Sequence, residues 1–177
     1  MNEQGLKKDH FGYYNFKVIL IGDGEVGKTS LIKRYVFNEF LTDYKATIGS
    51  NLYVKDIKYK DKDVKLTIWD IAGQQKWEIM RPVYYRGAHG VLAVYDVTNE
   101  ESYKNLLTRW LDELKILKKT FKTIVIGNKI DLGDKIFAKD EELKEKFNFL
   151  AHIKASAKEG DNVEEAFRVL VEKLVEK

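Results

Sequence analysis

The sequence contains no cysteine and only one proline, Pro82, in 177 residues. A chain without cysteine cannot form disulfides, a cysteine zinc site or a thiol nucleophile, and it cannot carry prenyl or palmitoyl groups. Long hydrophobic runs are also missing, because the longest, such as Val91–Tyr95 and Thr123–Ile126, fall far short of the roughly 20 residues that span a bilayer. The first residues match neither a signal peptide nor a myristoylation site. These absences predict a cytoplasmic protein.

An excess of charge of one sign is absent as well. Lys and Arg number 31 and Asp and Glu number 28, which leaves a net charge of +3 with both signs scattered along the chain. This balance disfavours a nucleic-acid partner. A hydrophobic content of 44% is normal for a folded protein, and a chain of this length can bury roughly 70% of its unfolded surface. We therefore expect one compact domain.

Residues 1–15 are polar and have no periodicity, so we expect a loose N-terminal leader before one folded domain over residues 16–177. In that domain, short β-rich runs alternate with longer segments of helical period. This alternation predicts an α/β fold with a parallel sheet between helices. The expected strand and helix pairs are Phe16–Ile21 with Lys28–Phe37, Val91–Tyr95 with Glu101–Lys118, Thr123–Ile126 with Lys139–Lys146, and Leu150–Ala155 with Asn162–Glu176.

Two runs interrupt this alternation. Leu52–Tyr59 and Val64–Trp69 are separated only by Lys60–Asp63, and the second run alternates apolar and polar residues. This pattern predicts an antiparallel hairpin at the edge of the sheet.

Two of the expected helices begin with a capping pattern, in which a short polar residue precedes a glutamate by three positions. Thr98 and Glu101 form this pattern before the helix Glu101–Lys118. Asp161 and Glu164 form it before the last helix. We therefore expect Thr98 and Asp161 to cap these helices.

The first strand leads into Gly22–Thr29, which fits the pattern G-x-x-x-x-G-K-[ST] between a strand and a helix. Glycines let successive N–H groups converge on phosphate oxygens, Lys28 adds a cation for the β- and γ-phosphates, and Thr29 offers a hydroxyl to Mg²⁺. A chance match arises in on the order of one chain in a hundred, and the motif alone leaves adenine and guanine open. The candidate nucleotide-binding residues are Gly22, Asp23, Gly24, Glu25, Val26, Gly27, Lys28, Thr29 and Ser30.

The segment Asp70–Gln74 follows the second strand of the hairpin. An acid at this edge of the sheet faces the phosphate loop, so Asp70 can hold Mg²⁺ through a water. The N–H of Gly73 can approach a terminal phosphate because no side chain blocks it, and the amide of Gln74 can orient a water in line with a γ-phosphate. Taken alone, the segment would be better explained as an exposed loop.

A third motif, Asn128-Lys129-Ile130-Asp131, follows the apolar strand Thr123–Ile126 and so lies at the same edge of the sheet. The carboxylate of Asp131 can accept hydrogen bonds from N1–H and N2–H₂ of guanine, and adenine has no donors at these places. Such a buried mismatch can discriminate by roughly 10⁴-fold. The motif therefore favours guanine.

With the segments Lys65–Gln74, Tyr84–Val91 and Tyr95–Thr98, these motifs make the chain resemble the Ras-superfamily small GTPases, and most closely the Rab family, over residues 16–176. The resemblance implies a P-loop NTPase fold. In this small G domain, a six-stranded sheet is parallel except for one edge strand and carries five helices on its two faces.

Further site residues come from the resemblance alone. It implies that Thr47 joins Thr29 on Mg²⁺, and that Gln74, Lys28 and Thr47 are the catalytic residues. Phe40 and Tyr44 match positions that pack near the guanine and close over the phosphates. The remaining matches are Ser156, Ala157 and Lys158 around the base, with Lys129 beside them, and Leu52, Trp69 and Tyr84 as a triad that faces effectors. For Trp69, a plain aromatic on the sheet face is an equal alternative.

The resemblance also implies slow hydrolysis of GTP to GDP and phosphate by a molecular switch with Mg²⁺ as cofactor, which acts in membrane trafficking. The expected partners are an exchange factor, a GTPase-activating protein and effectors, and we expect a monomer. Neither Arg81 nor Arg86 is expected to be an arginine finger. The alternatives are a GTP-bound interaction module with little or no hydrolysis, and a P-loop ATPase or kinase, which the guanine motif disfavours. A metal enzyme built on His10, His89 and His152 lacks ligand spacing.

Two departures from the family bear on nucleotide binding and on membrane attachment. Glu25 stands where the phosphate loop usually has glycine or alanine, and its charge is expected to weaken nucleotide binding unless it points away. From Asp161 to Lys177 there are five acidic and three basic residues and no cysteine, so we expect no direct membrane anchor and recruitment to membranes through partners. A truncated chain and a relative that works without lipid both remain open.

Overall fold

The structure is a computed structural model that describes residues 8–40, 46–73, 79–116, 121–133, 138 and 140–176. Tyr44 and Gln74 lie outside the described residues. The helices and strands are β1 (Tyr14–Ile21), α1 (Lys28–Phe37), β2 (Ser50–Tyr59), β3 (Lys62–Ile71), α2 (Arg81–Tyr85), β4 (Gly90–Asp96), α3 (Glu100–Asn105), the π-helical turn η2 (Leu106–Trp110), α4 (Leu111–Ile116), β5 (Lys122–Asn128), the 3₁₀ turn η3 (Ile130–Leu132), α5 (Asp140–Lys146), β6 (Ala151–Ala155) and α6 (Val163–Val175).

The strands form one six-stranded sheet in the order β2-β3-β1-β4-β5-β6. All neighbouring strands are parallel except β2 and β3, which are antiparallel. The central strands come from the continuous apolar runs, and all seven residues of β4 are buried because both faces of the sheet are covered. Within the described residues, the helices number five when α3, η2 and α4 are taken as one. The predicted P-loop small G-domain fold is therefore confirmed.

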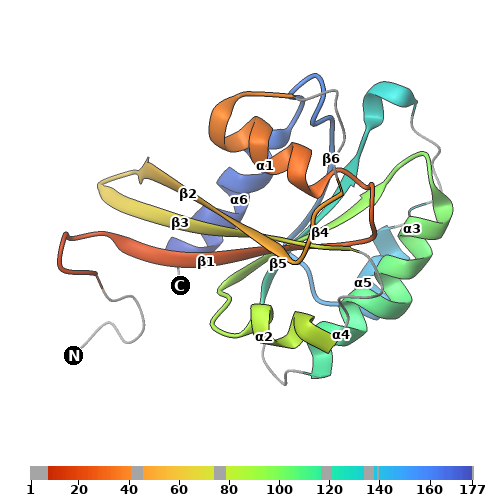
Figure 1. Cartoon of the computed structure of the whole chain (residues 1–177), viewed down its shortest axis with the longest axis horizontal. Coiled ribbons are helices and arrows are strands. Elements are labelled where there is room, and N and C mark those ends of the chain that lie inside the picture. The colour runs from red at the N-terminus through yellow and green to blue at the C-terminus, as the bar shows by residue number, and fades with distance from the viewer. Residues whose placement is uncertain are drawn as a thin grey trace.

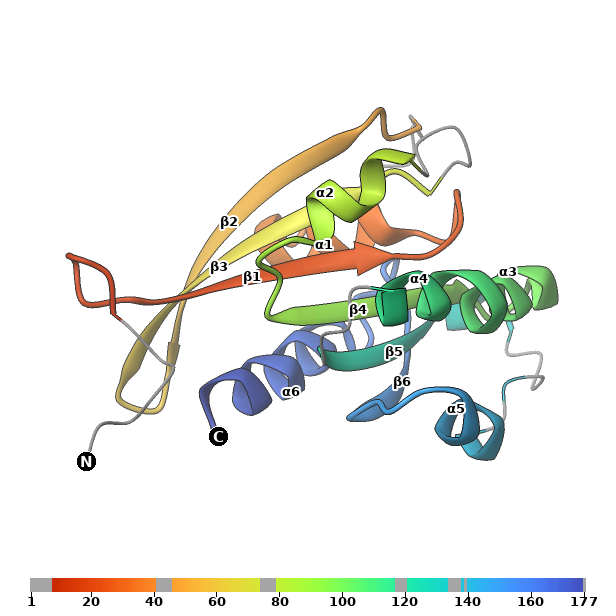
Figure 2. The ribbon, with the colours of Figure 1, turned by 90° about the horizontal axis from the view of Figure 1, so that it is seen from below.

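Helices cover both faces of the sheet, with α1 on one side and α2 and α4 on the other (Figure 1). Alternate residues of β1 serve the two cores, since Val18 packs in the α1 and α6 layer and Ile19 in the layer of α2, α3, α4 and α5. In the first layer Tyr35 stacks on Phe167 with ring centroids 3.8 Å apart. In the second, Trp110 is fully buried. Figure 2 shows α3 and α4 in line beside β4.

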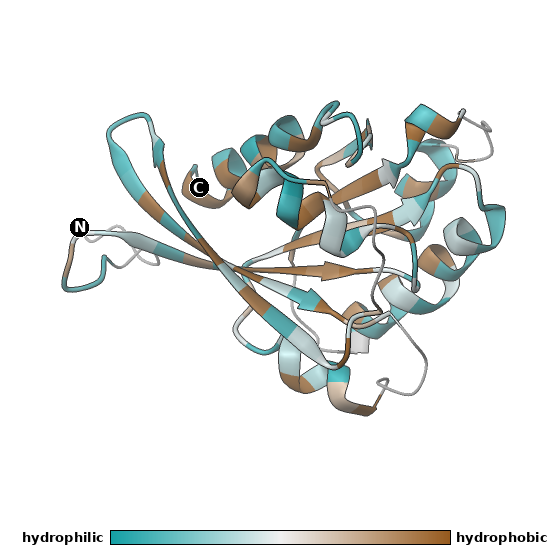
Figure 3. Cartoon of the chain, turned by 45° about the horizontal axis from the view of Figure 1, so that its top comes forward, coloured by the Kyte–Doolittle hydropathy of each residue, from teal (hydrophilic) through white to brown (hydrophobic). Residues whose placement is uncertain are grey.

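The β2–β3 hairpin, with β1 beside it, extends past β4, β5 and β6 (Figure 2). Its turn is shorter than the sequence predicts, because Tyr59 already pairs with Lys62 and only Lys60 and Asp61 connect them. Lys60 adopts a left-handed backbone with φ +54° to close this turn. Figure 3 shows the mostly hydrophilic far end of the hairpin and the hydrophobic central strands.

The first strand begins at Tyr14, two residues before the predicted Phe16. Ahead of it, the carboxylate of Asp9 accepts hydrogen bonds of 2.9 Å from the N–H groups of Phe11 and Tyr13. This side chain replaces backbone partners in a turn, which a scan for periodicity does not detect.

Both predicted helix caps were wrong. The cap of α3 is Asn99, whose side chain accepts from the N–H groups of Glu101 and Ser102, while the hydroxyl of Thr98 donates to Asp96 Oδ1. The cap position of α6 is Asn162, which has φ +57° and makes no side-chain capping bond. In both cases the chain enters its helix one residue later than the capping pattern indicates.

The short helix α2 and the π-helical turn η2 were not predicted. The turn lies inside the predicted helix Glu101–Lys118, where Leu111 N–H donates to Leu106 O five residues back. A hydrophobic pattern does not separate this spacing from that of an α-helix. No described helix combines the length and the apolar character that crossing a membrane requires.

Candidate functional site

Two glycines in the loop between β1 and α1 hold positions that no residue with a side chain could take. A Cβ on Gly22 would lie 2.1 Å from Val94 O, and one on Gly27 would lie 2.2 Å from Asn128 Nδ2. Both residues also have positive φ, +137° and +95°. The loop leads into the ten-residue helix α1, whose cap residue Gly27 offers no side-chain bond to the first N–H groups. These groups and the helix dipole suit an anion.

Lys28 places a buried cation beneath this loop. Its Nζ donates to Gly22 O at 2.7 Å and to Asp23 O at 2.6 Å, and the residue is only 6% exposed. Burial lowers the pKa of Lys28 to about 8, although the carboxylates of Asp70 and Asp23 oppose this shift. An anion bound at the loop would favour the charged form of this amine.

Three side-chain oxygens meet at the ends of β3 and α1. Thr29 Oγ1 donates to Asp70 Oδ2 at 2.6 Å and lies 3.0 Å from Thr47 Oγ1, which itself lies 3.3 Å from the same carboxylate oxygen. Burial raises the pKa of Asp70, and the hydroxyl of Thr29 and the charge of Lys28 only partly offset it. Asp70 Oδ1 is buried and accepts no hydrogen bond from any residue that the structure describes. An orphaned carboxylate oxygen beside two hydroxyls fits a small divalent cation.

Gly73 brings the next segment against the phosphate loop. A Cβ at this position would lie 2.4 Å from the backbone carbon of Asp23 and 2.5 Å from Gly22 O. Only glycine allows this approach. Gln74, which follows directly, lies outside the described residues.

Asn128 ties the phosphate loop to the loop after β6. Its Nδ2 donates to Val26 O at 2.9 Å, and its Oδ1 accepts from the N–H of Ala157 at 3.0 Å. The predicted nucleotide contact of Asn128 is thus accompanied by a bridging role within the protein.

The neighbouring Lys129 has φ +72° and forms a 2.7 Å ion pair with Asp96. Burial opposes the ionisation of Asp96, but the bonds from Lys129 and Thr98 outweigh it and lower its pKa.

The other residues predicted to bind guanine also lie at the carboxyl edge of the sheet. Asp131 Oδ1 accepts from Ser156 Oγ at 2.7 Å, and Lys158 Nζ lies 3.9 Å from Asp131 Oδ2. Ser156 and Ala157 are buried, whereas Lys158 is exposed. The hydroxyl of Ser156 therefore fixes the orientation of the Asp131 carboxylate, which keeps free lone pairs for two further donors.

Arg34 supports the predicted guanine-binding loop after β6, a role that the sequence did not indicate. From α1, its Nε donates to Ala157 O at 3.0 Å and its Nη2 to Lys158 O at 2.5 Å. No local sequence pattern indicates that an arginine on a helix binds carbonyl groups more than 120 residues away. The guanidinium of Arg34 thus binds the loop that contains Ala157 and Lys158 to α1.

Other predicted residues lie around this edge with less defined contacts. Ser30 is half-buried on α1, Phe40 is half-buried and packs on the α1 and α6 core, and Gly24 and Glu25 are exposed. Glu25 has φ +66°, a conformation that glycine adopts without strain. Tyr44 lies outside the described residues.

The predicted effector triad gathers next to α2. Leu52 is 55% exposed and pairs in register with Trp69, whose ring centroid lies 6.1 Å from that of Tyr84. Lys17 Nζ covers the Trp69 ring at 4.1 Å. Trp69 is thus both a packed aromatic of the sheet and part of a partly exposed apolar surface.

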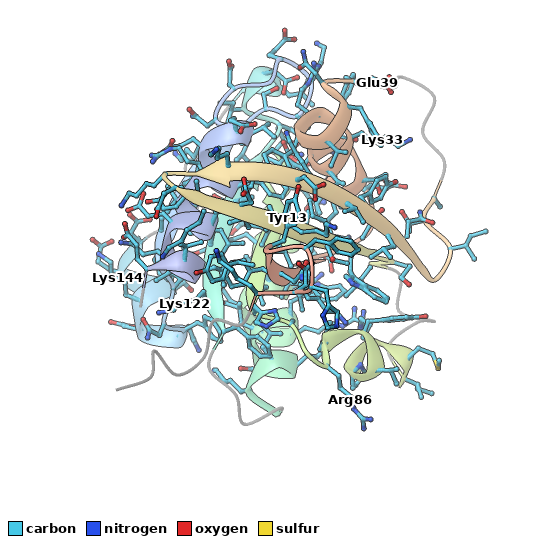
Figure 4. The ribbon with its side chains drawn as sticks, turned by 90° about the vertical axis from the view of Figure 1, so that its left-hand side faces the viewer. Tyr13, Lys33, Glu39, Arg86, Lys122 and Lys144 are labelled. Carbon is cyan, nitrogen blue, oxygen red and sulfur yellow. The ribbon has the colours of Figure 1, made fainter. Side chains whose placement is uncertain are left out.

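The two arginines near α2 differ in setting. Arg81 is fully buried and its Nη2 donates to Glu113 Oε1 at 2.8 Å, so its role is structural. Arg86 is exposed, and Figure 4 shows its side chain projecting from the surface beyond α2.

The histidines do not form a metal centre within the described residues, where no group of three potential His, Asp or Glu ligands occurs. His152 bridges Tyr95 and Asp140 at 2.9 and 2.7 Å, and His89 Nδ1 accepts from the N–H of Lys17.

The model of the Ras family matches residues 17–176. The Ras-related protein Rab-1 of Theileria parva is 40% identical over 167 residues, which cover 93% of this chain and 76% of that protein. Rab-18 of Lymnaea stagnalis is 41% identical over 163 residues, with 90% and 80% covered. The GTP-binding protein YPT1 of Saccharomyces cerevisiae is 38% identical over 166 residues, with 92% and 80% covered. The chain therefore belongs to the Ras family and is a Rab-like small GTPase.

Proposed function

We propose that the site at the carboxyl edge of the sheet binds Mg²⁺·GTP and hydrolyses it slowly to GDP and phosphate, and that the chain works as a switch in membrane trafficking. Ras and Rab GTPases in general bind GTP, GDP and Mg²⁺. The observation that carries the proposal for these residues is the oxygen cluster of Thr29, Thr47 and Asp70 next to the buried amine of Lys28.

The chemistry proposed for this site is in-line attack of water on the γ-phosphate. Lys28 would exchange its bonds to Gly22 O and Asp23 O for phosphate oxygens, and the N–H groups of Gly24–Gly27 and Gly73 would hold the charge that spreads over the transferring group. Gln74 would orient the water. Mg²⁺, held by Thr29, Thr47 and, through a water, Asp70, would supply further neutralisation of phosphate charge.

The base is held by the opposite part of the site in this proposal. Asp131 accepts from guanine, and Lys129 and Lys158 flank the ring. The N–H of Ala157, which donates to Asn128 Oδ1 in the structure, would be shared with the base. Ser156 and Arg34 support this arrangement through the bonds that they make to Asp131 and to the carbonyl groups of the loop. Phe40 and Tyr44 are proposed to pack near the base and close over the phosphates.

The switch would be read by partners. The γ-phosphate orders the segments around Thr47 and Gly73, and hydrolysis releases them. An exchange factor, a GTPase-activating protein and effectors are proposed as partners, with Leu52, Trp69 and Tyr84 facing effectors. Since no arginine finger is assigned, a GTPase-activating protein that supplies one could add about 10³–10⁵ in rate. We also propose that residues 16–177 form the G domain and that the protein is cytoplasmic and reaches membranes through partners.

Single-turnover hydrolysis of Mg²⁺·GTP and Mg²⁺·ATP by the purified chain tests the proposal, with Gln74→Leu as the variant. The adjacent Gln75→Leu is the matched control. We expect slow turnover of GTP alone, lost in Gln74→Leu and kept in Gln75→Leu. Binding of GTP without turnover would contradict the proposed hydrolysis and indicate an interaction module. Turnover of ATP would indicate an ATPase instead.

Glu25 allows a separate prediction about nucleotide release. Its carboxylate is exposed on the phosphate loop, three residues before Lys28. We expect Glu25→Ala and the uncharged isostere Glu25→Gln to slow GDP release by about fivefold, since a like charge near a phosphate costs on the order of 1 kcal/mol in water. Displacement of a fluorescent GDP analogue measures the rate. Equal release from the parent chain and both variants would show that the carboxylate points away from the phosphates.

A further inference from the structure

The carboxylate of Asp23, near the start of the phosphate loop, is held by residues of α3 and η2. Asp23 Oδ2 accepts from Asn105 Nδ2 at 2.8 Å, and Oδ1 accepts from the indole Nε1–H of Trp110 at 2.7 Å. The sequence assigned Asp23 to the nucleotide, but only its backbone carbonyl faces Lys28. Its side chain instead fixes the loop to the neighbouring helix.

The π-helical turn makes this double contact possible. Asn105 and Trp110 are five residues apart, which in an α-helix places two side chains roughly 140° apart around the axis. The i to i+5 bond between Leu106 O and Leu111 N–H widens the helix between them. Both side chains can then face Asp23.

The same Trp110 ring is packed against a buried charge from α2. The guanidinium carbon of Arg81 lies 4.3 Å from the ring centroid, and both residues are fully buried. Arg81 donates to one oxygen of Glu113 and the hydroxyl of Tyr85 donates to the other, each at 2.8 Å. Because Arg81 and Tyr85 both belong to α2, the helix is bound to Glu113 of α4 at two points.

A continuous path therefore runs from α2 to the phosphate loop through one indole. Arg81 meets the face of the ring, the N–H of the ring meets Asp23, and the Asp23 carbonyl meets Lys28. Lys28 Nζ itself lies 6.0 Å from the centroid of the Trp110 ring. A shift of either end displaces the indole, because a close-packed interior leaves no room to absorb it.

We propose that Trp110 is a positioning residue that couples α2 to the phosphate loop, so that the placement of α2 sets the rate at which nucleotide is released. The inference rests on the proposed function of the phosphate loop. It assigns no contact with the nucleotide to Trp110 or Arg81. Both act through the carboxylate of Asp23.

A double-mutant cycle on GDP release tests the first link. Trp110→Phe keeps an aromatic ring against Arg81 and removes the N–H. We expect it to raise the release rate about five- to tenfold, which is less than the full effect of a hydrogen bond to a charged group because Asn105 still holds the other carboxylate oxygen of Asp23. Asp23→Ala should raise the rate as well, and adding Trp110→Phe to it should change the rate by less than about twofold, because the acceptor is already gone.

Tyr103→Phe is the matched control. It removes one aromatic hydrogen bond, 3.3 Å to Glu142, from the same helical segment but away from the loop, and should leave release unchanged. The second link is tested with Arg81→Lys, which keeps the charge and loses the planar stack. We expect about threefold faster release that disappears in the Asp23→Ala background. Glu113→Gln serves the same purpose if Arg81→Lys does not fold.

An unchanged GDP release rate in Trp110→Phe would overturn the inference. So would a double variant in which the rate increases of Trp110→Phe and Asp23→Ala multiply, because Trp110 would then act independently of Asp23. If the parent chain binds no GDP at all, the proposed function is contradicted, whatever the variants show. The two failures are thus distinguishable.

Discussion

Asp131→Ala is expected to lower the affinity for GDP by roughly 10⁴-fold and to leave the weak affinity for ADP unchanged. Asp131 is the acceptor proposed for N1–H and N2–H₂ of guanine, and Ser156 Oγ holds its carboxylate in place at 2.7 Å. Without the carboxylate, both guanine donors lose their partner, whereas adenine loses nothing. The preference for guanine over adenine should therefore largely vanish.

Competition of GDP and ADP against a fluorescent nucleotide measures this preference at equilibrium. Asp112→Ala is the control, because Asp112 is an exposed aspartate that pairs with Lys115 on α4. A variant at Asp131 that still prefers GDP by more than about a thousandfold would move base recognition to other residues of the edge.

Lys28→Met should weaken the binding of GDP and GTP alike, by about 10²–10³-fold, and leave the preference for guanine intact. Hydrogen bonds from a charged group are worth about 1.5–3 kcal/mol each, and the buried amine has at least two donors for phosphate oxygens. Methionine fills a similar volume without the charge. Lys104→Met, on the exposed side of α3, provides the control.

Isothermal titration of the nucleotide-free variants with GDP measures this loss, and circular dichroism shows whether the fold is kept. If Lys28→Met binds GDP as tightly as the parent chain, the amine serves only the two loop carbonyls that it meets in the structure. The phosphate-binding role would then fall to backbone N–H groups alone.

The sheet and the phosphate loop could be predicted from the sequence because both depend on short-range patterns. Continuous apolar runs such as Val91–Tyr95 have only one stable place, which is the centre of a sheet covered on both faces. Gly27 and Gly73 are required because a Cβ would collide with Asn128 or with the backbone of Asp23. Local spacing carries this information.

Long-range side-chain contacts could not be predicted in this way. Arg34 binds carbonyls of a loop that lies more than 120 residues later, and Arg81 meets Glu113 across two helices. Asp23 and Asn128 carry the motif residue types, but their side chains also hold protein partners. These side-chain contacts depend on how the helices and strands pack against one another, and the sequence of a single segment does not determine that packing.

Helix boundaries failed for a related reason. The sequence around Thr98 matched the capping pattern, yet its hydroxyl donates to Asp96, two residues earlier, and Asn99 caps the helix instead. A short polar side chain has several hydrogen-bond partners within reach, and the local sequence pattern does not decide among them.

The strand order carries a consequence for how the protein is made on the ribosome. β1 is synthesised first and lies in the middle, and β4, β5 and β6 then join one side in the order in which they emerge. The phosphate loop is thus available early, while Ala157, which closes onto Asn128, arrives only after most of the 177 residues have been added. The residues proposed to bind the phosphates are therefore synthesised well before those proposed to bind the base, so both halves of the proposed site are present only when synthesis is nearly complete.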